Sequence, residues 1–283
     1  TWTQLLDVVT SPAGADRAQV LIRQNGTPAA SDGYYAWCVQ ISRISASAVY
    51  DEFGRFVTGS WGAADSLQTW TLTGGTGTDF SVTSGYGRHI NTAVSAAHHS
   101  TIAAPGPDFD IYCDIAVAAL STGASQFAGI LARFVDINNL YEARTETTTG
   151  GAVILSIRKR VGSAETQLGT FTSSLAAAAG TFVRVRFQGT GTSLRARIWA
   201  PGGEEPTAWH VDVTDAAFSA AGSIGMKSVR NSGNTNANAE SRFENFALVN
   251  PQIFTVARAV NGISKSQALA QDVRLAQPAV AAL

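Results

Sequence analysis

The sequence predicts an all-β protein built on a double-sheet jelly roll. Short apolar runs alternate with polar residues along most of the chain, which is the pattern of half-buried strands. Turn-forming residues recur roughly every 8 to 12 residues, a spacing typical of sandwiches and barrels. The composition agrees, with 27 glycines and only 14% charged residues. Helix is expected to be a minor component.

The chain is long enough for one main domain with smaller parts at either side. It has 283 residues, of which 45% are hydrophobic, and this can fill one core of domain size. We expect a partial β-sandwich segment over residues 1–46, a main β-sandwich over residues 47–250, and a C-terminal hairpin segment over residues 251–283. Asn250-Pro251 marks the last boundary, because proline lacks the backbone donor that a strand needs.

Charge and hydropathy argue against two classes of partner. The formal net charge is -1, so the chain has no overall basic field that would attract nucleic acid. No apolar run reaches the ~18 residues of a membrane-spanning helix, so a membrane is not an expected partner either. Any electrostatic recognition must therefore be local.

The first segment contains three strand-like runs, at residues 2–9, 17–24 and 34–43, with turn formers between them. The Pro-Ala-Gly turn at 12–14, the strand at 18–23 and the aromatic strand after it resemble the C-terminal half of a carbohydrate-binding-module-like β-sandwich. The acidic pair that usually follows the aromatic strand is absent, so the resemblance does not imply sugar binding by this segment.

The main domain is organised around a hairpin over residues 127–146. Asp136-Ile-Asn-Asn forms its turn, because Asx side chains bond nearby backbone and tolerate positive φ. Further strands are expected at 70–73, 79–82, 87–91, 109–118, 152–160, 165–171, 181–188, 193–199, 210–213, 222–227 and 242–249. This number of short antiparallel strands fits a jelly roll.

A second hairpin is predicted near the C-terminus, over residues 254–266. Asn261-Gly262 supplies the two positive φ angles of a type I′ turn. A hairpin of that size is not stable alone, and the chain ends in an apolar stretch that begins at Pro278. We therefore expect this segment to pack on another subunit or a neighbouring protein, with a homotrimer as the favoured assembly.

Two signatures together indicate a family. The run that begins Tyr50-Asp-Glu-Phe-Gly-Arg, with Gly59-Ser-Trp-Gly and Trp70-Thr-Leu-Thr after it, resembles laminin-G or concanavalin-A-like domains of minor tail proteins of actinobacterial phages. The C-terminal segment from Phe254 is similar to the closing segment of the same proteins. The resemblance implies a structural virion protein of the phage tail tip, extracellular when it acts. It also implies other tail proteins and host cell-wall glycan as partners.

Arginines at a spacing of two predict a polar sheet face opposite the core, because every second residue of a strand points the same way. Such a face is either solvated and laced by cross-strand ion pairs, or a groove for a polyanionic or hydroxyl-rich glycan. In a groove, Arg forks would bind anions and a tryptophan would stack on a sugar. The candidate ligand-binding residues are Arg133, Glu142, Arg144, Arg186, Arg197 and Trp199.

Enzyme activity is not expected. Glycoside hydrolysis needs two carboxyl groups at most about 9.5 Å apart, whereas Glu142 and Glu146 on one strand are separated by roughly 13 Å. Arg144 between them would also favour their ionised forms. The alternatives to a tail protein are a secreted glycan hydrolase of jelly-roll fold and a bacterial extracellular lectin.

No cofactor is certain from the sequence, although calcium is a candidate. Related jelly-roll domains often hold calcium where the first and last strands meet, and by that resemblance Asp51 and Glu244 are the candidate ligands. Calcium takes six to eight oxygen ligands. The two carboxylates could therefore supply only part of such a site.

Overall fold

A computed structural model describes residues 17–19, 40–42, 49–83 and 85–249. The chain divides into two compact units, and residues 44–251 form the larger one. In the smaller unit, β1 (Arg17–Gln19) and β2 (Gln40–Ser42) form an antiparallel pair. The remaining parts of the predicted N-terminal strands and the whole predicted C-terminal hairpin lie outside the described residues, so the two boundaries between the three segments stay predictions.

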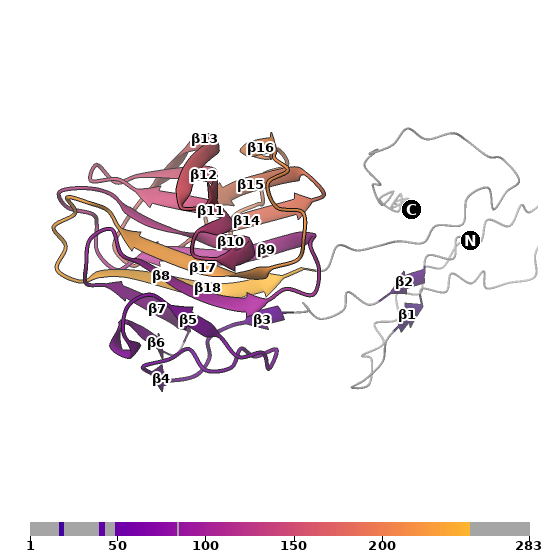
Figure 1. The fold of residues 1–283 in the computed structure, drawn as a ribbon, viewed down its shortest axis with the longest axis horizontal. Helices are drawn as coiled ribbons and strands as arrows, with labels where there is room; N and C mark the ends of the chain where they lie inside the picture. The colour runs from indigo at the N-terminus through magenta and orange to yellow at the C-terminus, as the bar shows by residue number, and fades with distance from the viewer. Residues whose placement is uncertain (1–16, 20–39, 43–48, 84, 250–283) are drawn as a thin grey trace, which may run out of the picture. The chain divides into compact units, whose positions relative to one another are not determined.

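The larger unit is a sandwich of two antiparallel sheets (Figure 1). One sheet has seven strands in the spatial order β13-β12-β11-β10-β17-β8-β5. Their bounds are β5 Thr71–Thr73, β8 Ala97–Ala103, β10 Gln126–Asp136, β11 Asn139–Thr147, β12 Ala152–Val161, β13 Ala164–Ala176 and β17 Ser223–Arg230.

The second sheet has nine strands. Eight follow the order β16-β15-β14-β9-β18-β7-β6-β4, and β3 pairs with β18 beside them. Their bounds are β3 Val49–Asp51, β4 Val57–Thr58, β6 Phe80–Thr83, β7 Tyr86–Asn91, β9 Phe109–Val117, β14 Val183–Thr190, β15 Ser193–Trp199, β16 Val211–Thr214 and β18 Ala239–Leu248. A short 3₁₀ turn spans Gly77–Asp79. No helix among the described residues has the length and apolar character to cross a membrane.

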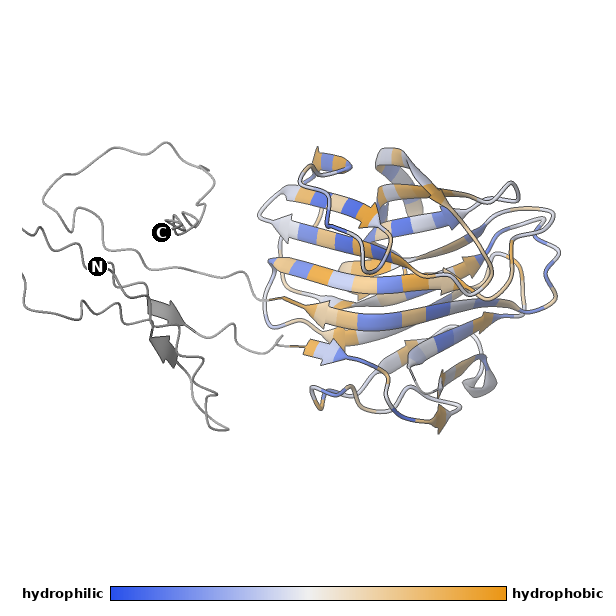
Figure 2. Ribbon diagram, turned by 180° about the vertical axis from the view of Figure 1, so that it is seen from behind, coloured by the Kyte–Doolittle hydropathy of each residue, from blue (hydrophilic) through white to orange (hydrophobic). Residues whose placement is uncertain are grey.

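The core lies between the sheets and follows the predicted alternation. Hydrophobic and hydrophilic bands alternate along the strands in Figure 2. Val185 and Ile198 are 0% and 2% exposed, whereas Arg184 and Arg186 on the alternate positions of β14 are only half-buried. The predicted strand register is therefore confirmed, because a slip of one residue would have exchanged the two sets.

The predicted all-β class and the central hairpin are confirmed. In the turn, the Asp136 carboxylate accepts hydrogen bonds from the Asn138 amide at 2.7 Å and the Asn139 side chain at 3.0 Å. These bonds lower the pKa of Asp136. The prediction missed β8, whose sequence Ala97-His-His-Ser-Thr-Ile-Ala places polar residues on both faces. Ser100 takes part in the core network described below, and His98 contacts Asn91 of the same network.

Close packing of the seven-stranded sheet gives a first prediction. A Cβ at Gly225 would lie 2.0 Å from the backbone oxygen of Ser100 on the neighbouring strand, whereas a Cβ at Gly54 would meet nothing within 4 Å. Gly225→Ala should therefore lower the free energy of unfolding by about 3 kcal/mol, measured by urea denaturation. Gly54→Ala is the matched control, and equal stability of the two variants would contradict this packing.

Candidate functional site

The structure separates the six candidate ligand-binding residues. Glu142 and Arg144 lie on β11 in the seven-stranded sheet, whereas Arg186, Arg197 and Trp199 lie on β14 and β15 in the nine-stranded sheet. The two groups occupy the outer faces of opposite layers. The prediction that one sheet carries them all is wrong, because strand alternation identifies a face but not the sheet to which that face belongs.

Arg133 leaves the predicted face altogether. A β-bulge shifts the register between Ala132 and Asp136, and Arg133 takes a φ of 45°. Its guanidinium donates to the backbone oxygens of Pro107 at 2.9 Å and Phe218 at 2.7 Å. The side chain is buried. Arg133 therefore links the backbone around Pro107 to the backbone around Phe218 at one end of the sandwich.

The outer face of the nine-stranded sheet is laced by ion pairs. Arg186 donates to both oxygens of Asp110, at 2.7 and 2.6 Å, and to Glu205 at 2.7 Å. Burial lowers the pKa of Arg186, but these carboxylates outweigh it and hold the pKa above its usual value. Arg184 makes a similar bidentate pair with Asp114 at 2.6 Å.

The side chains of Arg197 and Trp199 also contact partners within the protein. Arg197 pairs with Glu205 and lies 4.2 Å above the ring of Trp209. Trp199 packs edge-on against Tyr112 at 6.2 Å between ring centres and is only 8% exposed. Stacking on a sugar requires an accessible ring face, which Trp199 lacks. This face therefore fits the solvated, ion-paired alternative.

A buried ion pair lies on the outer face of the seven-stranded sheet. Lys227 Nζ on β17 reaches Glu142 Oε2 on β11 at 2.6 Å, with exposed fractions of 2% and 1% for the two side chains. The strand between them contributes Gly129, where a Cβ would come within 3.1 Å of Glu142 Oε1. The glycine thus leaves room for the two side chains to meet across β10. We call Glu142 and Lys227 the central pair.

Neighbouring cations keep the Glu142 carboxylate charged. Burial raises the pKa of Glu142, but Lys227 and then Arg144 oppose it and hold the pKa below its usual value. Next to Lys227 lies His99, and burial followed by the Lys227 charge lowers the pKa of His99 to about 4. Glu142 Oε1 has no hydrogen-bond partner within the part of the chain that the structure describes.

A continuous row of side chains runs beside the central pair, and all of them except the buried Arg144 are partly or fully exposed. Arg144 lies 4.6 Å above the ring of Phe127 and donates to Glu165 at 2.7 Å. Arg158 donates to Glu165 at 2.9 Å and to Gln167 at 2.7 Å. We call these five residues, which span β10 to β13, the outer-face strip. It brings together an aromatic ring, two guanidiniums, a carboxylate and an amide.

Sequence reasoning identified Glu142 and Arg144 but missed several of their neighbours. Lys227 could have been noticed in the sequence, because it is the one charged residue in the otherwise uncharged run Ser223–Val229. His99 gave none, because β8 was not recognised as a strand. Phe127 and Glu165 lie far from Arg144 in sequence, and alternation within one strand does not say which strands are neighbours.

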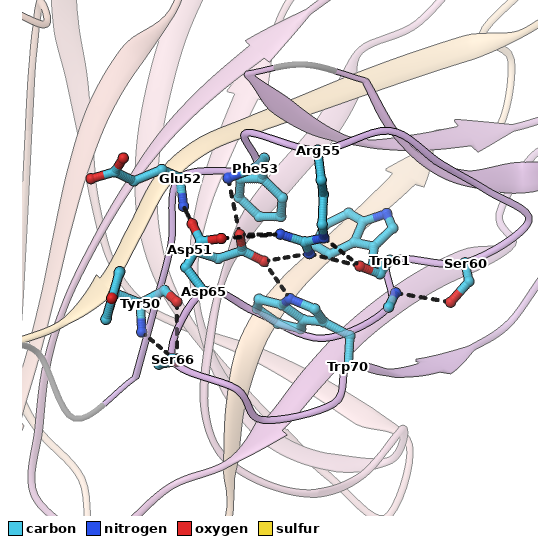
Figure 3. Close-up of polar contacts among 11 residues, drawn as sticks. Tyr50, Asp51, Glu52, Phe53, Arg55, Ser60, Trp61, Asp65, Ser66 and Trp70 are labelled. Carbon is cyan, nitrogen blue, oxygen red and sulfur yellow. Dashed lines mark hydrogen bonds and ion pairs between the residues drawn. The ribbon is translucent and has the colours of Figure 1, made fainter.

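Asp51 does not have free oxygens for calcium (Figure 3). Its Oδ1 accepts from the Phe53 amide at 2.9 Å and from Arg55 Nη1 at 2.6 Å. Its Oδ2 accepts from Arg55 Nη2 at 2.8 Å and from Trp70 Nε1 at 2.7 Å. A metal ion on Asp51 would have to displace the guanidinium that already neutralises it.

Glu244 lies elsewhere on the last strand. It is opposite Asp114 in the ladder of β18 and β9, whereas Asp51 is opposite Phe246. Burial and then the Asp114 charge raise the pKa of Glu244. Across residues 49–83 and 85–249, no three His, Cys, Asp or Glu side chains gather as a metal site would require. Asp51 and Glu244 therefore do not form the calcium ligand set that the resemblance implied.

Comparisons with known proteins give the fold. No protein-family model and no curated protein match this chain. A GH43 protein from Bacillus licheniformis is similar in structure, with a TM-score of 0.51 and 12% identity over 71% of this chain and 39% of that chain. Carbohydrate binding module CBM66 from Bacillus subtilis gives 0.47 and 15% over 64% and 95%. The VIP36 exoplasmic/lumenal domain in its Ca2+/Man3GlcNAc-bound form gives 0.46 and 13% over 68% and 86%.

The GH43 likeness at a TM-score of 0.51, together with the two sheets, defines the fold class. The larger unit is a concanavalin-A-like jelly-roll β-sandwich. At 12 to 15% identity the comparisons extend to the fold alone. Function must be argued from the side chains of this chain, because one fold carries many functions.

A buried polar network joins the two sheets inside the core. Ser228 Oγ donates to Asn91 Oδ1 at 2.6 Å. Its hydroxyl proton is thereby used, so His89 Nδ1 donates to Ser228 Oγ at 3.0 Å and His89 Nε2 accepts from Ser100 at 2.7 Å. This arrangement needs neutral His89, and burial lowers its pKa.

These histidines predict acid sensitivity. Burial lowers the pKa of His89, His98 and His99 in the folded protein. As the pH falls below about 6.5 the unfolded chain binds protons first, so stability present at neutral pH is lost. Each histidine that stays neutral contributes about 2 kcal/mol between about pH 7 and pH 5, so the free energy of unfolding should fall by about 4 kcal/mol or more in urea titrations. A constant value across that range would contradict the neutral, buried histidines.

Proposed function

We propose that this chain is a non-enzymatic, glycan-binding component of an actinobacterial phage tail tip. Binding occurs on the outer face of the seven-stranded sheet. The observation that carries the proposal is the outer-face strip, a run of five side chains from four strands. Hydroxyl-rich sugars are bound by such combinations of planar polar groups and aromatic rings, which supply hydrogen bonds and an apolar contact.

The ligand class follows from the charge pairing. Arg144 and Arg158 share Glu165, and Lys227 is paired with Glu142. Residues 49–249 contain 14 Lys and Arg against 17 Asp and Glu. A polyanion would have to compete with these carboxylates and would approach a unit whose overall charge is negative. Of the two glycan classes considered from the sequence, this favours a neutral, hydroxyl-rich one.

The same groups argue against hydrolysis. A general acid must be protonated at the working pH, whereas Lys227 and Arg144 hold the pKa of Glu142 low. Glu146, the other carboxylate on this face of β11, accepts a hydrogen bond from Ser125 at 2.7 Å. The strip therefore supports recognition without cleavage.

The tail context rests on the two sequence signatures. Residues 50–73 and the C-terminal segment from Phe254 resemble minor tail proteins, and we propose the virion as the location and other tail proteins as partners. The apolar C-terminal segment supports docking to a neighbour, in a homotrimer or against another tail protein. Host cell-wall glycan is the corresponding external ligand.

Glycan binding can be tested with Phe127→Ala, because removing the ring takes away the apolar contact of the strip. Retention on immobilised neutral polysaccharides (galactan, mannan, xylan) should weaken about tenfold, as measured by biolayer interferometry. Binding by the parent chain should change little with salt. Arg195→Ala, which removes an ion pair with Asp212 on the other sheet, is the matched control.

Three outcomes would count against the proposal. Absence of binding to every polysaccharide would contradict glycan recognition itself. Binding to an anionic polymer such as polygalacturonate, with affinity falling steeply as salt rises, would contradict the neutral ligand class. Release of reducing ends from any bound polysaccharide would contradict the non-enzymatic role.

A further inference from the structure

Oxygen atoms from the end of β3 and from the segment after it surround the Arg55 guanidinium (Figure 3). The Arg55 guanidinium is 2.6 and 2.8 Å from the two Asp51 oxygens. It also donates to the backbone oxygen of Trp61, at 2.7 Å from Nη2 and 3.2 Å from Nε. Asp65 Oδ1 lies 3.7 Å from Nη1. We call these oxygen atoms of Asp51, Trp61 and Asp65 the oxygen cage.

The cage is built into the core and holds a strained backbone. Asp51 is fully buried, and its neighbour Phe53 has a φ of 56°, a conformation that is costly for a bulky side chain. Phe53 packs edge-on against Trp61 at 5.3 Å, and Trp61 against Trp70 at 5.2 Å. The cage thus ties the strained turn to a buried aromatic cluster.

The cage also fastens the first strand of the sandwich to the last. Asp51 ends β3 and is opposite Phe246 of β18, and the Phe246 ring lies 5.3 Å from Trp70. An uncompensated carboxylate at Asp51 would be expensive, because a buried charge needs a partner of opposite sign. A cation in the cage therefore stabilises the junction of these two strands.

We propose that Arg55 is a tethered cation that fills the position a metal ion would otherwise take in this cage, so that the sandwich closes without calcium. Two carboxylates and a carbonyl converge on one positive group, an arrangement of donors that suits a hard cation. Here the cation is covalently part of the chain, five bonds of side chain away from its own backbone. Its bidentate fork matches Asp51 in a way that a point charge cannot.

The experiment compares three substitutions of Arg55 by thermal unfolding, each with added calcium and with EDTA. Arg55→Lys keeps the positive charge without the fork, Arg55→Gln keeps donors without the charge, and Arg55→Ala removes both. The parent Tm should be the same in calcium and in EDTA. Arg55→Ala should lower Tm by about 5 °C or more, and Arg55→Lys should retain more of the parent Tm than Arg55→Gln.

Arg195→Ala is the control, because it removes an arginine whose ion pair is exposed on the same sheet. Its Tm should stay close to that of the parent. A parent Tm that rises with calcium or falls with EDTA would overturn the proposal. A Tm of Arg55→Gln equal to or above that of Arg55→Lys would also overturn it. Hydrogen bonds alone, without a positive charge, would then be enough to stabilise the cage. If Arg55→Ala does not fold, the Tm values of Arg55→Lys and Arg55→Gln still test the proposal.

Discussion

The central pair is the interaction on which the outer face of the seven-stranded sheet depends. Lys227 and Glu142 belong to strands that are not neighbours, and they meet across β10 at Gly129, where a Cβ would crowd Glu142. Each charge is almost fully buried, so neither can be left alone without a cost of about 3–5 kcal/mol. The pair therefore holds β10, β11 and β17 in one register and sets the charge of the face around it.

The same principle recurs through the described sandwich. Asp51 with Arg55, Asp110 with Arg186, and Asp114 with Arg184 each join a buried carboxylate to a guanidinium. A protein whose cations are already occupied by its own carboxylates is poorly suited to polyanions or nucleic acid. Hydroxyl groups can still bind such a surface, because they add hydrogen bonds without displacing an ion.

Local features of the fold could be predicted from the sequence, and long-range ones could not. Alternation placed Val185 and Ile198 in the core, and the Asx residues placed the turn of the central hairpin. The bulge that turns Arg133 inward has no signal in the sequence of β10. Likewise, Asp51 reads as a possible metal ligand until Arg55 and Trp70 are seen to fill its oxygens, which depends on how residues 51–70 fold back.

The central claim is that most cations of this sandwich are held in internal ion pairs, and the central pair tests it most directly. A double-mutant cycle would measure the free energy of unfolding of the parent, Lys227→Met, Glu142→Gln and the double variant in urea. We expect a coupling energy of about 2 kcal/mol or more, since each single change leaves a buried group unpaired. A coupling energy below about 0.5 kcal/mol, as for an exposed pair, would contradict the account.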